Sequence, residues 1–203
     1  MNAYFAKAVL LEEGTSEKLF YTELAKSLNI DLDYNNISIL SVDGVQFAVY
    51  VKILNALEIP WSIRTDNDVS KITVKGVEKR NLAGVNRCLS AVGLDKLDHM
   101  DVLTTSESLY QDGTWGTVSQ KINPLGAYLA KVDLETDISY ELPDKLLAYT
   151  GKPSLDGAIE FLATKKAIRM REFLASLQEG DLLAIKAGDL VRPLLDSLNK
   201  SMS

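Results

Sequence analysis

The stretch Val9-Leu10-Leu11-Glu12-Glu13-Gly14-Thr15-Ser16-Glu17 decides how the N-terminal part of this chain folds. An apolar run ends there in Glu13-Gly14, and a pattern with helical spacing begins directly afterwards at Glu17. Further along the chain, a second apolar run ends in Asp66-Asn67-Asp68. In a parallel α/β sheet, side chains at the C-terminal ends of neighbouring strands share one crevice. The two motifs therefore predict a cluster of four carboxylates: Glu13, Glu17, Asp66 and Asp68.

Such a cluster has a direct chemical consequence. Ionised carboxylates at one place repel each other strongly, so they must bind cations or hold protons. Grouped oxygen ligands suit Mg²⁺ or Mn²⁺. A third strand-like run, 127–132, ends in Asp133-Leu134-Glu135 and would deliver two more carboxylates from a strand end. We expect Glu12 to be a solvated neighbour of the cluster and not a ligand.

The first 65 residues alternate between strand-like and helix-like patterns. Strands are expected over 6–11, 37–42 and 61–65, and helices over 17–28 and 47–57. Strand, helix, strand, helix, strand with short turns is typical of a parallel sheet with right-handed crossovers. The fold class is therefore α/β, with a Rossmann-like parallel sheet flanked by helices. Asp43-Gly44 is expected to form the turn that ends the second strand.

The rest of the chain is expected to elaborate this sheet. Helices are expected over 81–92, 158–177 and 187–198. The domain division that follows is a catalytic domain over 1–140, a helical or irregular insertion within it over about 74–123, and a C-terminal helical extension over 141–203 that completes the site.

Composition excludes several kinds of site. Cys88 is the only cysteine and His99 the only histidine, so the chain can form neither an internal disulfide nor a zinc site built on thiolates or several imidazoles. A Ser-His-Asp triad would have to use His99, and no nucleophile-elbow sequence accompanies it. The chain lacks both an apolar run long enough for a membrane span and a secretion signal. We therefore expect a cytoplasmic protein with no membrane partner.

The motifs Leu10-Leu11-Glu12-Glu13-Gly14-Thr15-Ser16-Glu17, Ser41-Val42-Asp43-Gly44 and Thr65-Asp66-Asn67-Asp68 together resemble a Toprim domain. The pattern is most similar to the overcoming-lysogenization-defect (OLD) nucleases, including the nuclease half of the Gabija-type defence protein. The resemblance implies a metal-dependent DNA endonuclease with a two-metal-ion mechanism. Such a protein would be the nuclease part of an ATPase-nuclease system in phage defence or DNA processing.

The resemblance also implies roles for individual residues. Two Mg²⁺ or Mn²⁺ ions would be held by Glu13, Glu17, Asp66, Asp68, Asp133 and Glu135, and we expect Glu13 and Asp66 to be indispensable. A lysine near position 165 would lie beside the scissile phosphate. Lys165 and Lys166 both fit this role, and Lys152 is a further candidate.

The partners implied by the resemblance are DNA and an ABC-type ATPase. The chain contains no Gly-x-x-x-x-Gly-Lys-Ser/Thr motif, so it is a standalone nuclease domain, the partner of a separate ATPase, or the C-terminal part of a longer protein. A formal charge of −6 with no long basic run is unlike a tight DNA binder. We therefore expect an oligomer in which other subunits add DNA affinity.

Two other functions fit the same motifs: a non-catalytic Toprim scaffold that loads DNA, and a topoisomerase or primase. The second is disfavoured because Val69-Ser70 replaces the third acid that those enzymes often show. Each motif also has a plain structural interpretation. Glu13 and Glu17 would stabilise a helix N-terminus, 66–68 would be a polar turn, and the lysines near 165 would form a solvated helix face.

Overall fold

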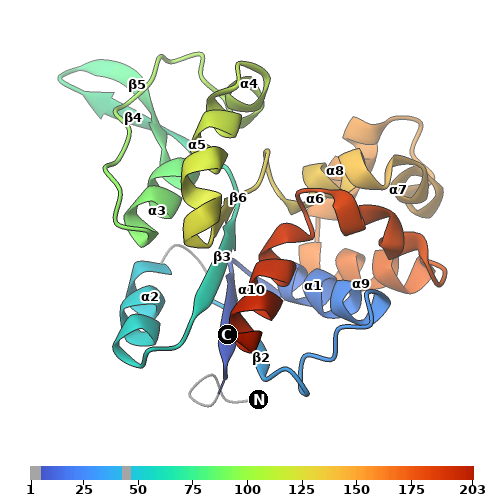
Figure 1. Ribbon diagram of the computed structural model, residues 1–203. Helices are drawn as coiled ribbons and strands as arrows, with labels where there is room; N and C mark the ends of the chain where they lie inside the picture. Colours follow the sequence, from blue (N-terminus) through green and yellow to red (C-terminus); the bar gives the residue numbers. More distant parts are fainter. Residues whose placement is uncertain (1–5, 43–46) are drawn as a thin grey trace.

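The computed structural model describes residues 6–42 and 47–203, so the turn expected at Asp43-Gly44 lies outside the described residues. Its centre is a parallel sheet (Figure 1) with strands in the order β2-β1-β3-β6. These strands are β1 (Ala8–Glu12), β2 (Ile37–Ser41), β3 (Trp61–Thr65) and β6 (Ala127–Leu129). The predicted α/β fold with a parallel sheet is confirmed.

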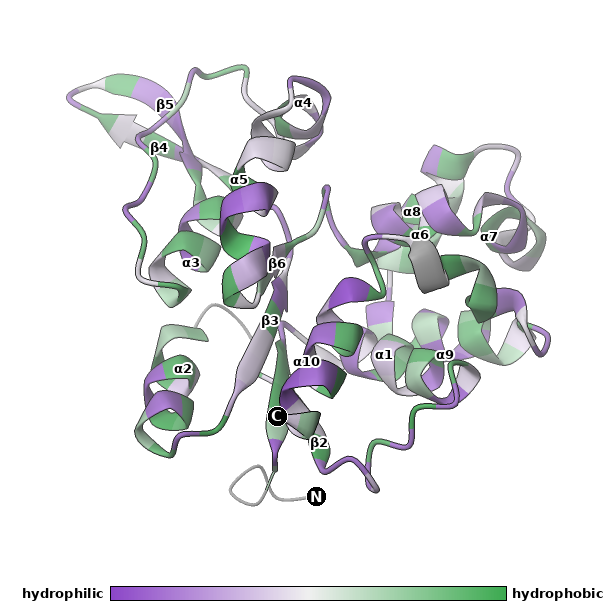
Figure 2. Cartoon of the chain, in the orientation of Figure 1, coloured by the Kyte–Doolittle hydropathy of each residue, from purple (hydrophilic) through white to green (hydrophobic). Residues whose placement is uncertain are grey.

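Strand β1 is apolar on both faces from Ala8 to Leu11, as expected for a parallel strand that helices cover on both sides. Alternate residues point to opposite sides. Val9 and Leu11 pack with Phe47 of α2 (Phe47–Ala56), whereas Leu10 packs with Phe20 of α1 (Thr15–Ser27). The helices around the sheet carry both hydrophobic and hydrophilic residues (Figure 2), as expected for elements that are buried on one side only.

The helices fall into two groups. Helix α1 shares a hydrophobic cluster with the C-terminal elements, which are α6 (Leu134–Glu141), α7 (Pro143–Thr150), α8 (Leu155–Ala163), α9 (Lys166–Ser176), the 3₁₀ helix η3 (Asp181–Ala187) and α10 (Arg192–Met202). The opposite face carries α2, while Ala127 and Leu129 of β6 pack with α3 (Ala83–Ala91), α4 (Ser106–Gln111) and α5 (Thr114–Ile122). The 3₁₀ helix η2 (Asn123–Leu125) leads into β6.

The segment expected to be a helical or irregular insertion also contains an antiparallel hairpin, formed by β4 (Val69–Val74) and β5 (Val77–Leu82). The hairpin begins directly after Asp68 and projects beyond the sheet (Figure 1). Sequence patterns missed it because neither of its faces is fully buried, so the apolar-polar alternation of a half-buried strand is weak.

The helix expected over 158–177 is broken. Helix α8 ends at Ala163 and α9 begins at Lys166, and Lys165 between them has the left-handed φ of 61°. The apolar pattern continues through the break, which is why periodicity alone suggested one helix. The terminal helix begins at Arg192 and not at 187, and Pro193 lies in its first turn, where a missing N–H costs nothing.

Among the described residues, no helix combines the length and the apolar composition needed to cross a membrane.

Candidate metal centre

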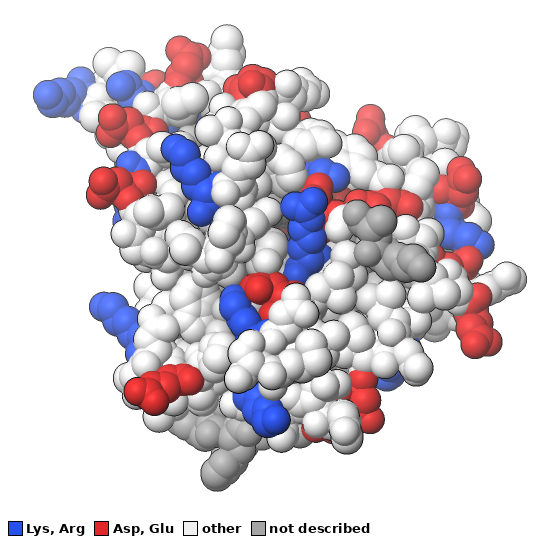
Figure 3. Space-filling view, in the orientation of Figure 1, with Lys and Arg blue, Asp and Glu red and all other residues white. Residues whose placement is uncertain are grey.

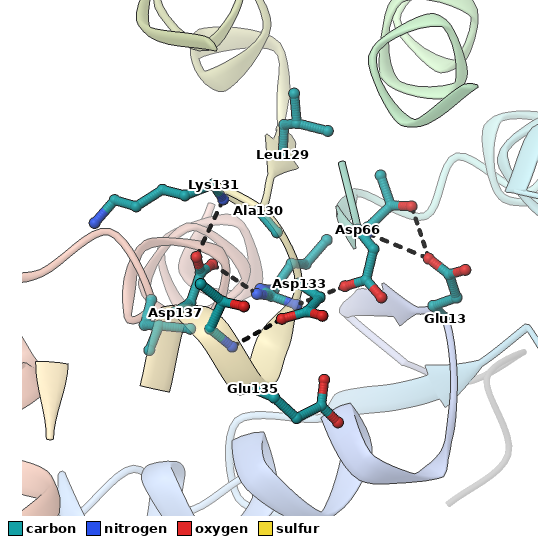
Figure 4. A network of polar contacts seen from close by, with 12 residues as sticks. Glu13, Asp66, Leu129, Ala130, Lys131, Asp133, Glu135 and Asp137 are labelled. Atoms are coloured by element: carbon teal, nitrogen blue, oxygen red, sulfur yellow. Dashed lines mark hydrogen bonds and ion pairs between the residues drawn. The ribbon is translucent and has the colours of Figure 1, made fainter. Parts of the chain in front are cut away.

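Glu13 and Asp66, at the ends of β1 and β3, lie next to each other (Figure 4). The Oε2 atom of Glu13 accepts hydrogen bonds from the Thr65 hydroxyl, at 2.9 Å, and from the backbone N–H of Asp66, at 3.2 Å. The turn after β1 is joined to β2 as well, because the Ser41 hydroxyl donates to the Gly14 carbonyl at 3.1 Å. The parallel sheet therefore brings the two strand-end motifs together.

Asp66 is a buried carboxylate with little direct compensation. Its Oδ1 lies 3.8 Å from Arg64 Nη1 and its Oδ2 lies 4.0 Å from Lys166 Nζ, and Oδ1 has no hydrogen-bond partner. Burial raises the pKa of Asp66 well above its ordinary value, and Glu17 and Glu13 raise it further against the opposing effect of Arg64. Such a carboxyl group must either hold a proton or receive a cation.

Asp133 and Glu135 lie at the start of a helix, which corrects the expectation that a strand end delivers them. Strand β6 stops at Leu129, and Asp133 caps α6 by accepting a 2.8 Å hydrogen bond from the backbone N–H of Thr136 (Figure 4). Glu135 follows in the first turn of α6, and its side chain is fully buried. Burial raises the pKa of Glu135, and neither of its carboxyl oxygens has a hydrogen-bond partner.

Of the three candidate lysines, only Lys166 reaches the acids. Its Nζ lies 3.5 Å from Glu135 Oε2 and 4.0 Å from Asp66 Oδ2, and its side chain is 47% exposed. Burial alone would lower the pKa of Lys166, but the nearby carboxylates, Glu135 first, raise it overall. Lys165 forms the exposed left-handed break before α9, and the Nζ of Lys152 lies 5.5 Å from the Phe161 ring centroid.

Glu17 and Asp68 complete the predicted set in different ways. Glu17 is buried in the first turn of α1, and its charge adds to the raised pKa of both Asp66 and Glu135. Asp68 is partly exposed, and its Oδ2 lies 2.7 Å from Nη2 of Arg87. Of the predicted set, Glu13 contacts Asp66 directly, whereas Asp68 is paired with Arg87.

Glu12 is not solvated, contrary to expectation. It is fully buried, and both of its carboxyl oxygens lack a hydrogen-bond partner. As the last residue of β1 it lies on the same face as Leu10, under α1. Burial raises the pKa of Glu12 well above its ordinary value, and Glu17 adds to this shift.

Sequence patterns missed the basic residues of this region. Arg64 of β3 is buried, and its Nη2 lies 2.8 Å from Asp137 Oδ2 of α6. Asp137 also accepts a 3.1 Å hydrogen bond from the backbone N–H of Lys131 (Figure 4), and burial raises its pKa to about 6. A lone arginine inside an apolar strand was the available signal for Arg64. No comparable signal marks Arg87, one of several basic residues near α3.

Within residues 6–42 and 47–203, no three His, Cys, Asp or Glu side chains are placed closely enough to hold an ion as they stand. The donor chemistry nevertheless fits a hard cation. Asp66 and Glu135 have buried carboxyl oxygens without partners, and an uncompensated buried carboxylate is costly. Mg²⁺ and Mn²⁺ prefer such oxygen ligands. Asp66 and Glu135 are therefore the residues best suited to hold a divalent ion, and the buried Glu17 is a further candidate.

The parallel sheet and the acids near the C-terminal ends of its strands agree with the Toprim resemblance. Residues 4–68 match the family model described as "Overcoming lysogenization defect protein-like, TOPRIM domain". This part of the chain thus matches the OLD-like Toprim family, and the resemblance inferred from the sequence motifs is confirmed.

The chain is also similar to a curated relative and to solved structures. It is 29% identical over 194 residues to Endonuclease GajA of Bacillus cereus (strain VD045), covering 89% of this chain and 33% of that protein. The chain thus spans about a third of the length of that relative. It shares its fold with the C-terminal region of the Xanthomonas campestris pv. campestris OLD protein, with a TM-score of 0.61, 20% identity and coverage of 98% of this chain and 97% of the other. For the C-terminal region of the Burkholderia pseudomallei OLD protein the TM-score is 0.51, with 21% identity and 97% coverage of both chains.

Proposed function

We propose that this chain is a metal-dependent endonuclease domain that hydrolyses phosphodiester bonds in DNA. The observation that carries the proposal is the meeting of Lys166 with Asp66 and Glu135 at the C-terminal edge of the sheet. It combines buried anionic oxygens that need a cation with a half-exposed ammonium group. Together with the OLD-like Toprim match and the relative named as an endonuclease, this arrangement favours phosphoryl chemistry.

Each group has a separate task in this reaction. Asp66, Glu135 and Glu17 would hold one divalent ion, Mg²⁺ or Mn²⁺, and Glu13 and Asp68 would contribute to a second. When bound, such ions polarise the phosphodiester and make water a better nucleophile at neutral pH. Glu135 and Asp66 hold the Lys166 ammonium at the same edge, where it offsets negative charge on the phosphate. Glu13 keeps Asp66 in place through the backbone N–H of Asp66.

Water is the proposed nucleophile, and the single cysteine is unsuited to that role. Cys88 is buried, and burial raises the pKa of its thiol to about 12, so it stays protonated at neutral pH. An attacking water is also consistent with the absence of a nucleophile-elbow motif from the sequence.

A plasmid-nicking assay with the full chain and Mg²⁺ or Mn²⁺ tests the proposal. We expect nicking by the unchanged chain, loss of nicking in Lys166→Met, and near-normal nicking in the matched control Lys165→Met. Absence of cleavage with either ion, at high protein concentration and low salt, would contradict an autonomous nuclease. Equal loss in both lysine variants would contradict the role given to Lys166.

A second candidate function is a non-catalytic Toprim scaffold for DNA loading. It is favoured by one observation: the acids are already partly neutralised by Arg64, Arg87 and Lys166, and the described residues show no ready three-ligand group. A Mn²⁺ titration separates the two functions. A scaffold would show no Mn²⁺ binding that is lost in Glu13→Ala, whereas the nuclease would.

We further propose that the domain works with an ABC-type ATPase, in an oligomer, in phage defence or DNA processing. Support comes from the similarity to GajA, of which this chain corresponds to about a third, and from the fold shared with the C-terminal regions of OLD proteins. Addition of the ATPase encoded with this domain should raise DNA affinity or cleavage. No change on addition would contradict the partnership.

A further inference from the structure

The predicted metal ligands differ in the cations that accompany them. Glu13 and Asp68 are both paired with one arginine, Arg87 of α3. Its Nη1 lies 2.9 Å from Glu13 Oε2 and its Nη2 lies 2.7 Å from Asp68 Oδ2. Nη1 also donates to the Thr65 hydroxyl oxygen. The guanidinium group thus spans the ends of β1 and β3.

Arg87 is built into this position. Its side chain is only 7% exposed, and its Cζ lies 5.9 Å from the ring centroid of Phe47. The helix that carries it is held against the same loop, because the backbone N–H of Gly84 donates to the Asp68 carbonyl at 3.0 Å. A Cβ at Gly84 would lie 2.2 Å from the Asp66 carbonyl oxygen, so only glycine allows this close approach. Arg87 therefore differs from a surface arginine that pairs with whichever acid is near.

The other ligands have weaker compensation. Asp66 and Glu135 face Lys166, whose Nζ stays 3.5 to 4.0 Å from their oxygens, and its side chain is 47% exposed. Asp66 Oδ1 and both Glu135 oxygens remain without a hydrogen-bond partner. One half of the site thus has short, forked ion pairs to a buried arginine, and the other half has buried carboxyl oxygens without hydrogen-bond partners.

From this asymmetry we infer that Arg87 serves as a resident cation of the site. It occupies the Glu13–Asp68 half in the ion-free chain, so a divalent ion binds first to the Asp66–Glu135 half. A second ion gains Glu13 and Asp68 only when Arg87 gives up its two charge-assisted hydrogen bonds. This inference rests on the proposed metal-dependent function. In it, Arg87 of α3 determines the order in which the two ions bind.

The size of the effect follows from the contacts that must break. Loss of even one charge-assisted hydrogen bond lowers an affinity by about tenfold or more. The two ion affinities of the unchanged chain should therefore differ by at least about tenfold. Replacing Arg87 with an uncharged side chain of similar length should strengthen the weaker site by at least the same factor.

Mn²⁺ binding to the full chain, followed by electron paramagnetic resonance and calorimetry, tests the inference without a cleavage assay. We expect two unequal sites in the unchanged chain and a strengthened second site in Arg87→Met. Arg171→Met, at an exposed arginine of α9, controls for the loss of one positive charge and should leave both sites nearly unchanged. Arg87→Lys keeps the charge without the fork, so its second site should have an intermediate affinity.

The outcomes separate this inference from the proposed function. No Mn²⁺ binding by any variant would contradict the metal-dependent function and, with it, the inference. Two sites of equal Mn²⁺ affinity in the unchanged chain would overturn only the role of Arg87. This measurement does not depend on the folding of any variant. The role of Arg87 would also be overturned if Arg87→Met left the Mn²⁺ affinity of the weaker site unchanged. The melting temperature of this variant shows whether it is folded.

Discussion

At the scale of single residues, the buried carboxylate of Asp66 lowers the stability of the ion-free chain, although the proposed function requires it. Its pKa is raised well above the ordinary value near 4, chiefly by burial. A carboxyl group with a raised pKa adds to stability below its unfolded pKa, and this contribution is lost as the pH rises through the folded value. At neutral pH an ionised Asp66 therefore lowers the free energy of unfolding of the ion-free chain.

We expect Asp66→Asn to abolish cleavage while keeping or raising the melting temperature of the chain in EDTA at pH 7. The loss in rate should be on the order of 10²-fold or more, as for a misplaced reacting group. The stability gain should shrink as the pH falls to about 4 and below, where the aspartate becomes protonated in the unfolded state as well. Thermal melts at several pH values and a nicking assay measure these effects. Normal cleavage would remove Asp66 from the site, and an unfolded variant would point to a purely structural role.

At the scale of elements, the break between α8 and α9 places Lys166 beside the acids. An unbroken helix over 158–177 would have a different register, and the two-residue interruption at Thr164 and Lys165 resets it. Lys165 has a φ of 61° there, a conformation that costs a residue with a Cβ about 1 kcal/mol. The lysine that breaks the helix is therefore distinct from the lysine that contacts the carboxylates.

This distinction leads to a prediction for Lys165→Gly. Glycine adopts the left-handed conformation without a steric penalty, so we expect stability to stay constant or rise by up to about 1 kcal/mol, with cleavage retained. Urea unfolding and the nicking assay are the measurements. A loss of cleavage without a loss of stability would show that Lys165 itself contacts the substrate.

Helix α3 is the second element that organises the site, because its first turn lies directly on the backbone of Asp66–Asp68. We expect Gly84→Ala to destabilise the chain by about 1–3 kcal/mol, as overpacked interiors do, and to weaken Mn²⁺ binding by displacing the loop. Gly116→Ala in α5 is the matched control. A Cβ at Gly116 meets nothing within 4 Å, so this variant should be neutral or slightly stabilising. Equal stability of the two variants would show that the close approach at Gly84 is dispensable.

At the scale of the whole molecule, charge limits what this chain does alone. The formal charge is −6, and on the face shown in Figure 3 basic and acidic side chains are interspersed. Phosphate contacts from lysine and arginine supply most non-specific DNA affinity. Several of the basic residues in the site, Arg64 and Arg87 among them, are already paired with acids.

We therefore expect the isolated chain to bind a DNA duplex no more tightly than about 1 µM at physiological salt, the upper end of non-specific affinity. Fluorescence anisotropy in EDTA, at several salt concentrations, measures this without cleavage. Tight binding that persists at high salt would contradict the view that partner subunits supply most of the affinity.

Some properties of this protein were determined by its sequence alone. Short apolar runs that end in Glu13-Gly14 and in Asp66-Asn67-Asp68, separated by helical patterns, predicted the parallel sheet of β1, β2 and β3 and the meeting of Glu13 with Asp66. These features are local in the sequence, and the geometry of parallel strands carries them into space. The same motifs carry the resemblance to the OLD-like Toprim family, whose model matches residues 4–68.

Only the tertiary structure decided which cations accompany the carboxylates and which acids are buried. Glu12 was expected in water but lies under α1, and Asp133 and Glu135 reach the site from the start of a helix. Arg87, on a helix much later in the chain, forms an ion pair with Glu13, and no periodic pattern in the sequence predicts this contact. The reason is physical: burial and ion pairing depend on how layers pack against each other, and such contacts between distant segments leave no trace in local spacing.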